Sequence, residues 1–225
     1  MSQARTAAWK ADIALRVRRY WPLKALGITG FTWLFFIGYF YVLRTPAYLP
    51  TMMPLTALDR LIPFQPAALF PYLTLWLYVG FAPGLQLSFR ALLVYGLWMS
   101  ALCVTGLTLF YFWPTTVPPR LMDVAGSPGF ALLNGVDATG NACPSMHVAV
   151  AMFSAICLED VLRRARVPPA WRLVNAAWFL AIAYSTLAIK QHVVLDVVAG
   201  ASLGAVFAWL SLRWRPATSV PPERN

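Results

Sequence analysis

The sequence predicts an all-α, polytopic membrane protein with six transmembrane helices. Of its 225 residues, 60% are hydrophobic and only 12% are charged, and the mean hydropathy is +0.62. A soluble domain of this length is far less apolar. The apolar residues are also grouped into long runs bounded by charged residues, Pro or Gly. A helix needs about 20 mostly apolar residues to cross a hydrocarbon core of about 30 Å, so runs near that length indicate spans.

Six runs reach or approach this length. They cover residues 23–43, 69–89, 92–113, 146–162, 173–189 and 192–212. The fourth and fifth runs are short. Almost nothing separates the fifth run from the sixth, which predicts a tight helical hairpin.

The basic residues give this topology an orientation. The formal net charge is +10, but Lys and Arg cluster between the apolar runs, which favours a membrane topology over a nucleic-acid interface. We therefore expect no nucleic-acid partner. With the N-terminus inside, the cytoplasmic segments hold Lys10, Arg16, Arg18, Arg19, Lys24, Arg90, Arg163, Arg164, Arg166, Arg172, Arg213 and Arg215. The outer segments hold Arg44, Arg60, Arg120 and Lys190.

This asymmetry predicts a multi-pass protein of the cell membrane, a bacterial inner membrane, with both termini in the cytoplasm. Residues 1–22 are a basic cytoplasmic segment, either an interfacial amphipathic helix or an ordinary basic anchor. Residues 23–213 form the transmembrane domain, and residues 214–225 form a cytoplasmic tail. The outer loop of residues 114–145 is rich in Pro and Gly, which favours an ordered re-entrant cap.

The cysteines argue against two other kinds of site. Cys103, Cys143 and Cys157 have neither the even number nor the spacing of a disulfide framework or a zinc site.

His192 and Asp196 begin the sixth run. Four residues apart on one helix, the two side chains lie on one face. An ionised carboxylate inside an apolar segment is costly unless it is paired, and its nearest partner is His192. By accepting the Nδ1 proton, Asp196 leaves Nε2 of His192 available as a nucleophile. The alternative is a purely structural His–Asp bond at a helix end.

His147 begins the fourth run, in the first turn of a helix whose N-terminal N–H groups lack partners within the helix. Such an end attracts anions. Ser145 is the expected N-cap, and its hydroxyl and the backbone N–H of Met146 are expected phosphate ligands. The alternative is a capped helix start that carries an interfacial histidine.

The joint pattern favours chemistry over either alternative. The only two histidines begin outward-facing helix ends, one has a carboxylate partner, and Arg120 lies in the outer loop between them. A phosphoryl group needs positive charge and N–H donors around its oxygens, an in-line nucleophile, and an acid for the leaving oxygen. Arg120 and, ranked after it, Lys190 are expected to supply the charge.

The acidic residues do not suggest a metal or cofactor. No carboxylate cluster with the pattern of a metal site occurs in the sequence, so we expect neither. Asp59, Asp123 and Asp137 are most simply interpreted as solvated loop residues, and the alternative is that one of them binds a polar acceptor.

Together these residues resemble the type 2 phosphatidic acid phosphatase superfamily, which is related to vanadium haloperoxidases. The resemblance covers about the last half of the chain, from Pro144-Ser145-Met146-His147 and Ser185-Thr186 through His192 to Asp196. It implies six transmembrane helices and an active site at one membrane face. It also implies that His192 is the nucleophile, Asp196 its partner and His147 the acid.

The sequence departs from the family pattern at three points. Thr186 stands where the family has arginine, Met146 stands where it has glycine, and the first motif, Lys-x6-Arg-Pro, is missing. Residues 114–120, 62–66 and 190–192 resemble the branch that includes inositol phosphorylceramide synthases. Arg120 would then replace the basic residue of the first motif.

We therefore expect a metal-independent lipid phosphate phosphatase that acts through a phosphohistidine at the extracytoplasmic face. The main alternative is a phosphotransferase that moves a phospho-headgroup to an alcohol acceptor. A non-enzymatic lipid or proton transporter is a third possibility, although the sequence shows no inverted repeat. The expected partners of the protein are the bilayer and a lipid phosphate or phospholipid.

Overall fold

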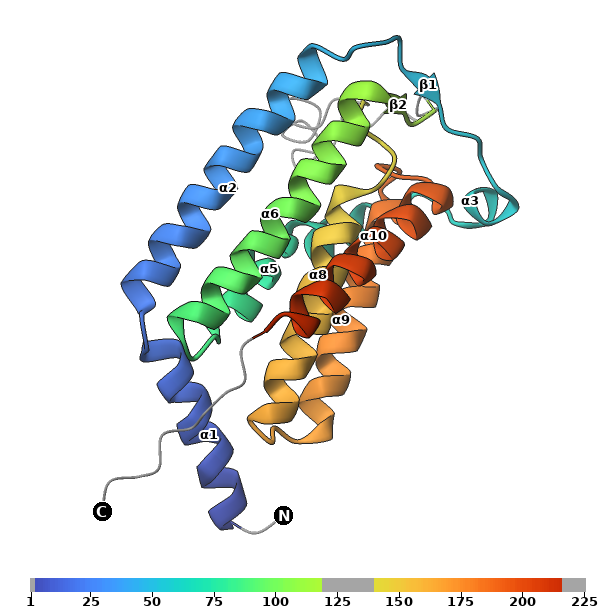
Figure 1. The fold of residues 1–225 in the computed structure, drawn as a ribbon. Helices are drawn as coiled ribbons and strands as arrows, with labels where there is room; N and C mark the ends of the chain where they lie inside the picture. Colours follow the sequence, from blue (N-terminus) through green and yellow to red (C-terminus); the bar gives the residue numbers. More distant parts are fainter. Residues whose placement is uncertain (1–2, 119–139, 216–225) are drawn as a thin grey trace.

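The computed structural model describes residues 3–118 and 140–215 (Figure 1). Within these residues the chain is mostly helical, as its composition predicts. The elements are α1 (Gln3–Arg18), α2 (Trp21–Arg44), β1 (Thr51–Met52), α3 (Ala57–Leu61), the 3-10 helix η1 (Pro66–Ala68), α4 (Leu69–Leu73), α5 (Leu75–Gly84), α6 (Phe89–Phe112), β2 (Thr115–Thr116), α8 (Met146–Arg164), α9 (Pro169–Ala188) and α10 (Val194–Arg213).

Each of the six predicted spans contains a helix, and within the described part of the chain four segments are long and apolar enough to cross a membrane. These are α2, the composite of η1, α4 and α5, then α6 and α10. Helices α8 and α9 fall short because charged residues such as Glu159, Arg163 and Arg172 occupy their adjacent ends. The number of spans therefore stays a prediction, while the apolar helices indicate a membrane protein.

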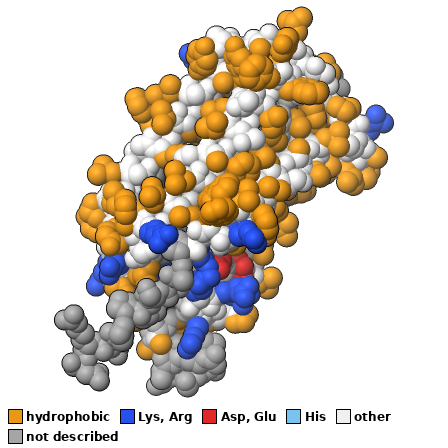
Figure 2. Space-filling model, viewed as in Figure 1, with side chains coloured by type: hydrophobic (Ala, Val, Ile, Leu, Met, Phe, Trp, Pro, Cys, Tyr) orange, Lys and Arg blue, Asp and Glu red, His pale blue; other side chains and the backbone are white. Residues whose placement is uncertain are grey.

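Charged and apolar side chains separate along the molecule. Helix α1 and the turn between α8 and α9 lie toward one end, and the β strands and α3 lie toward the other (Figure 1). Hydrophobic side chains cover most of the face in Figure 2, and Lys and Arg gather toward the end that holds α1. There, Arg172 pairs with Glu159, and both Arg164 and Arg215 pair with Asp160. These contacts tie together the ends of α8, α9 and α10.

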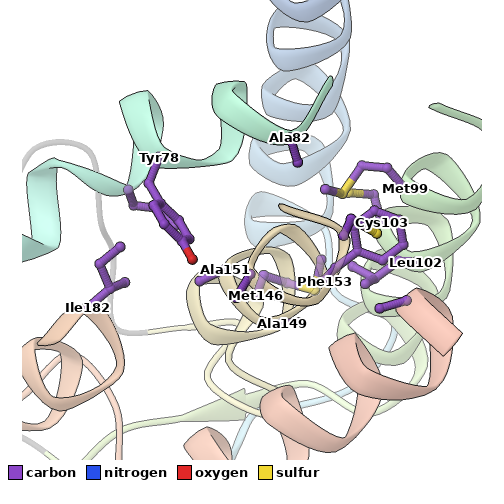
Figure 3. Packing of buried hydrophobic residues seen from close by; sticks show 14 of the residues in the cluster. Tyr78, Ala82, Met99, Leu102, Cys103, Met146, Ala149, Ala151, Phe153 and Ile182 are labelled. Carbon is purple, nitrogen blue, oxygen red and sulfur yellow. The ribbon is translucent and has the colours of Figure 1, made fainter. Parts of the chain in front are cut away.

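Helix α8 occupies the centre of the helical core. Figure 3 shows its small residues Ala149 and Ala151 close to side chains from α5, α6 and α9. Two buried polar contacts add to this packing. The Tyr78 hydroxyl donates to Oδ1 of Asn175 at 2.8 Å, and Nδ2 of Asn175 donates to the carbonyl of Ala155 at 3.0 Å. Such bonds hold helices together where no water competes for them.

A short parallel β ladder is the one regular departure from the all-α prediction within the described residues. Thr51 pairs with Thr115 and Met52 with Thr116. Thr116 also forms an antiparallel bridge with Gly140. The ladder joins the loop after α2 to the segment after α6, and so satisfies backbone groups where both helices have ended.

The N-terminal segment forms a helix of its own. Tyr20 adopts a left-handed conformation with φ of 57° between α1 and α2, so the two helices are not continuous. This form is compatible with the predicted interfacial helix, whose place in the membrane stays a prediction.

Candidate active site

The starts of α8 and α10 meet at the centre of the candidate site. Ser145, the residue before α8, donates its backbone N–H to the carbonyl of Asp196 in the first turn of α10, at 3.0 Å. Its hydroxyl accepts the N–H of Val148 at 3.3 Å, which makes Ser145 the N-cap that the sequence predicts. Both residues are fully buried. The two helix starts are therefore fixed relative to each other.

Two glycines of α10 permit this close approach. A Cβ atom added to Gly200 would lie 2.3 Å from the carbonyl oxygen of Ser145. One added to Gly204 would lie 2.2 Å from the carbonyl oxygen of Ala149. The Gly-x3-Gly spacing thus lets α10 lie directly against the backbone of α8, as in membrane helix pairs generally.

His192 and Asp196 lie together, although not on one helix as predicted. Helix α10 begins at Val194 after the cap residue Val193, so His192 precedes the helix. Nδ1 of His192 is still 3.4 Å from Oδ2 of Asp196, which also accepts the N–H of Val193 at 3.0 Å. Catalytic contacts are often long before substrate binds. The reason for the difference is the turn before α10, where the His192 N–H donates to the carbonyl of Thr186 at 3.1 Å.

His147 faces His192 across the site. The centroids of the two imidazole rings are 5.9 Å apart, so residues from two distant segments are brought within reach of one phosphoryl group. The His147 ring stacks on Tyr72 at 4.6 Å and meets the edge of Trp76 at 6.0 Å. These aromatic contacts restrict the orientation of the imidazole.

Asp59 braces the His192 turn, and its interpretation as a solvated loop residue is wrong. The side chain is buried, and Oδ1 accepts the N–H of Val194 at 2.8 Å. Oδ2 accepts the N–H and hydroxyl of Thr56 at 2.8 and 2.7 Å, which closes a capping box on α3. A carboxylate at the first N–H of α10 also complements the helix dipole. Asp123 and Asp137 lie outside the described residues.

The predicted phosphate ligands are only partly brought together. Ser145 and Met146 are at the start of α8 beside the two histidines. Lys190 instead directs Nζ to the carbonyls of Asp59, at 3.1 Å, and Ile62. In this arrangement its ammonium fastens the 59–62 segment to the His192 turn. Arg120 lies outside the described residues.

Several buried polar atoms around the site have no hydrogen-bond partner among the described residues. They include Nδ1 of His192, Oδ1 of Asp196 and Nε2 of Gln191. Buried polar atoms are normally paired, and active sites are a common exception. The Gln191 amide is a donor beside His192 that the sequence did not single out.

Cys143 is adjacent to the site but is a poor nucleophile. Burial and, to a smaller extent, the negative charge of Asp196 raise the pKa of its thiol to about 11. The thiol therefore stays protonated at neutral pH, whereas thiol nucleophiles act as thiolates. Cys103, Cys143 and Cys157 are all free.

Among the residues that the structure describes, no group of three or more His, Cys, Asp or Glu side chains could hold a metal ion. Two histidines beside a helix N-terminus instead suit an anion, with the carboxylate of Asp196 paired to His192.

One of three comparisons with known proteins found a match. A family model described as the PAP2 superfamily matches residues 27–219, a range that includes the histidines and Asp196. Neither the curated proteins nor the solved structures gave a match. Because the family model covers most of the sequence, the chain belongs to the PAP2 superfamily.

Proposed function

We propose that this protein is a membrane-embedded lipid phosphate phosphatase that acts through a phosphohistidine on His192. Membership of the PAP2 superfamily supports a phosphatase-type function on lipid phosphates in a membrane. The observation that carries the proposal is the pair of imidazole rings 5.9 Å apart, one of them 3.4 Å from a buried carboxylate.

In the first half-reaction, Nε2 of His192 attacks phosphorus and the bond from phosphorus to the lipid oxygen breaks. Asp196 accepts the Nδ1 proton, holds the ring and stabilises the positive charge that develops on it. His147 donates a proton to the leaving alkoxide. The N–H of Met146 and the start of α8 stabilise the charge on the phosphoryl oxygens.

In the second half-reaction, His147 removes a proton from water, whose oxygen attacks phosphorus. The bond between phosphorus and Nε2 breaks, its electron pair returns to His192, and inorganic phosphate leaves. An alcohol in place of water would take up the phosphoryl group as its phosphate ester, and with a phospholipid diester as substrate the group moved would be the phospho-headgroup. This transfer is the second candidate function, favoured by the resemblance of residues 62–66, 114–120 and 190–192 to inositol phosphorylceramide synthases.

The proposal includes six spans, cytoplasmic termini and an active site at the outer, periplasmic face. The excess of Lys and Arg at the end that holds α1 supports this orientation through the positive-inside rule. Exposed tryptophans at helix ends, such as Trp21 and Trp113, suit the two membrane interfaces.

The test uses purified protein in mixed micelles with a panel of lipid phosphates, with and without alcohol acceptors. Release of inorganic phosphate marks hydrolysis, and formation of a phosphate ester of the added alcohol marks transfer. We expect His192→Ala and His147→Ala each to lower turnover by orders of magnitude, and the double variant to be little worse, because the two residues act as a unit. Ser202→Ala, an exposed change on α10, is the matched control.

An aryl phosphate separates the roles of the two histidines. Its leaving group is a weak base and needs little protonation. We therefore expect His147→Ala to release one equivalent of aryl alcohol in a burst, while His192→Ala releases none. If both histidine variants turn over every lipid phosphate at the wild-type rate, the proposed catalytic role of the histidines is wrong. A lipid or proton transporter then becomes the better explanation.

A further inference from the structure

A large apolar cavity leads away from His147 into the membrane domain. Its volume is about 680 Å³, within the range of organic ligand sites, and it lies between α2, α5, α6 and α8. Aromatic and aliphatic side chains such as Phe31, Phe35, Val79 and Leu92 form its walls. A lining of this kind favours hydrocarbon and offers few groups to a polar ligand.

One end of the cavity is lined by residues of the candidate site. His147 contributes to the lining together with Tyr72 and Trp76, the two aromatic residues that its ring contacts. A molecule with its phosphate between the two histidines can therefore place the attached chain directly in the cavity.

The far end is closed by a buried ammonium group. Nζ of Lys24 donates to the carbonyl of Arg16 at 2.6 Å and to that of Gly84 at 2.8 Å. These carbonyls belong to the last turns of α1 and α5, so Lys24 joins both helix ends. Hydrocarbon does not replace such contacts without a large loss of solvation, which makes this end a floor.

The cavity is long for its volume. Along α6 the lining runs from Phe89 to Cys103, which is about 21 Å at the α-helical rise per residue. Half of the hydrocarbon core of a bilayer is about 15 Å thick. The cavity thus reaches from the candidate site past the depth of one leaflet.

We propose that this cavity holds one hydrocarbon chain of the lipid phosphate, and that the distance from His147 to Lys24 sets the longest chain that is turned over well. The inference rests on the proposed function and names its substrate class: a phosphate ester of a long, extended chain. Ordinary membrane lipid that fills the cavity without being a substrate is the competing occupant.

Glycines in the wall allow a test that adds bulk without a clash. An added Cβ at Gly27 or Gly96 meets nothing within 4 Å, and both residues line the cavity. Gly30 also has open space and lies on α2 with Gly27, but it does not line the cavity. Gly27→Leu and Gly96→Leu are the test variants, and Gly30→Leu is the matched control.

The measurement is kcat/KM for phosphate release from single-chain lipid phosphates of increasing length in mixed micelles. A chain that moves from a micelle into an apolar cavity gains little hydrophobic free energy, so the profile reports fit. We expect wild-type kcat/KM to hold steady and then fall beyond a limiting length. Gly27→Leu should shift this fall to shorter chains. It should also lower kcat/KM for the longest substrates about tenfold, which is the size of effect that one methylene group has on the fit in a pocket.

Gly96→Leu should shift the fall to still shorter chains than Gly27→Leu does. Gly27 lies three residues from Lys24 at the floor, whereas Gly96 lies closer to His147 along the cavity. Turnover of the shortest substrate should survive in both variants, which shows that they fold. If the wild type is active and the length profiles of Gly27→Leu, Gly96→Leu and Gly30→Leu are identical, the proposed binding site for the substrate chain is wrong. The cavity is then filled by ordinary membrane lipid. A wild type that hydrolyses no lipid phosphate would overturn the proposed function instead.

Discussion

Gly200→Ala is the change that best tests how the site is assembled. In an isolated helix this substitution stabilises by about 1 kcal/mol, because alanine is the better helix former. Here the new Cβ would lie 2.3 Å from the carbonyl oxygen of Ser145, where ordinary contact begins near 3.4 Å. The backbones of α8 and α10 must therefore separate by about 1 Å, because no flexible side chain can move away.

The cost follows from this displacement. Overpacking of a buried contact destabilises by about 1–3 kcal/mol, which offsets or exceeds the gain in helix propensity. The activity should fall more steeply than the stability. Asp196 moves with α10 while Ser145 and His147 move with α8, and a misplacement of about 1 Å can cost about 100-fold in rate.

Two controls separate packing from catalysis. At Gly80, in α5, an added Cβ meets nothing within 4 Å, so Gly80→Ala should raise the midpoint of thermal unfolding and leave activity unchanged. Gly204→Ala meets the carbonyl of Ala149, one turn further from the site, and should destabilise as Gly200→Ala does with a smaller loss of activity. The assays are thermal unfolding in detergent and kcat/KM for phosphate release. A Gly200→Ala variant as active and as stable as Gly80→Ala would refute the reasoning.

Three further predictions use the same assays. Ser145→Ala and Ser88→Ala each remove the N-cap of a long helix and should each cost about 1 kcal/mol of stability, but only Ser145→Ala should lower turnover; equal turnover would contradict a role beside the phosphate. Asp59→Ala removes the acceptor of the Val194 N–H and should lower kcat at least tenfold, whereas Thr56→Ala leaves that bond in place and should be nearly silent; the reverse order would show that only α3 matters. Exhaustive treatment with a chelator should leave activity intact, since the proposed steps use no metal, and rescue of lost activity by a divalent ion would contradict this.

Features encoded in short stretches of sequence were predictable. The apolar runs fixed the approximate positions of the helices because burial in lipid demands length and hydrophobicity locally. The pairing of His192 with Asp196 was predictable because four residues span little distance, and the structure keeps the pair together although His192 precedes α10. Ser145 as an N-cap followed from residue type and position alone.

Features that depend on distant segments were not predictable. The sequence Thr56-x-x-Asp59 signals a capping box, but nothing local indicates that the carboxylate also accepts the N–H of Val194. Lys190 shows the same difficulty, because a basic residue beside a catalytic histidine suggests phosphate binding, whereas its Nζ reaches backbone carbonyls instead. The stacking of Tyr72 on His147 likewise exists only once α4 and α8 meet.

Gly200 and Gly204 are a different case, because their spacing is itself a local signal of close helix packing. Gly-x3-Gly in an apolar helix predicts a close helix contact. It does not say which helix is the partner. Here the partner is the helix that begins with His147, so the motif fixes the distance between the two halves of the candidate site.

Helix α8 begins below the end of its neighbour α6, and only its first part, before Glu159, is apolar. The side chain of Met146 lies against Gly106 of α6, and the remaining residues of α6 up to Phe112 rise about 9 Å further. In the proposed six-span topology, α8 starts that far below the end of its neighbour and crosses the remaining hydrocarbon with fewer apolar residues, and its final turns reach the ion pairs at Glu159 and Asp160. The same offset places the histidines below the level at which α6 ends. In the proposed function, a lipid phosphate would reach them by moving inward along its own chain direction, and the apolar cavity that His147 helps to line would lie on the continuation of that path.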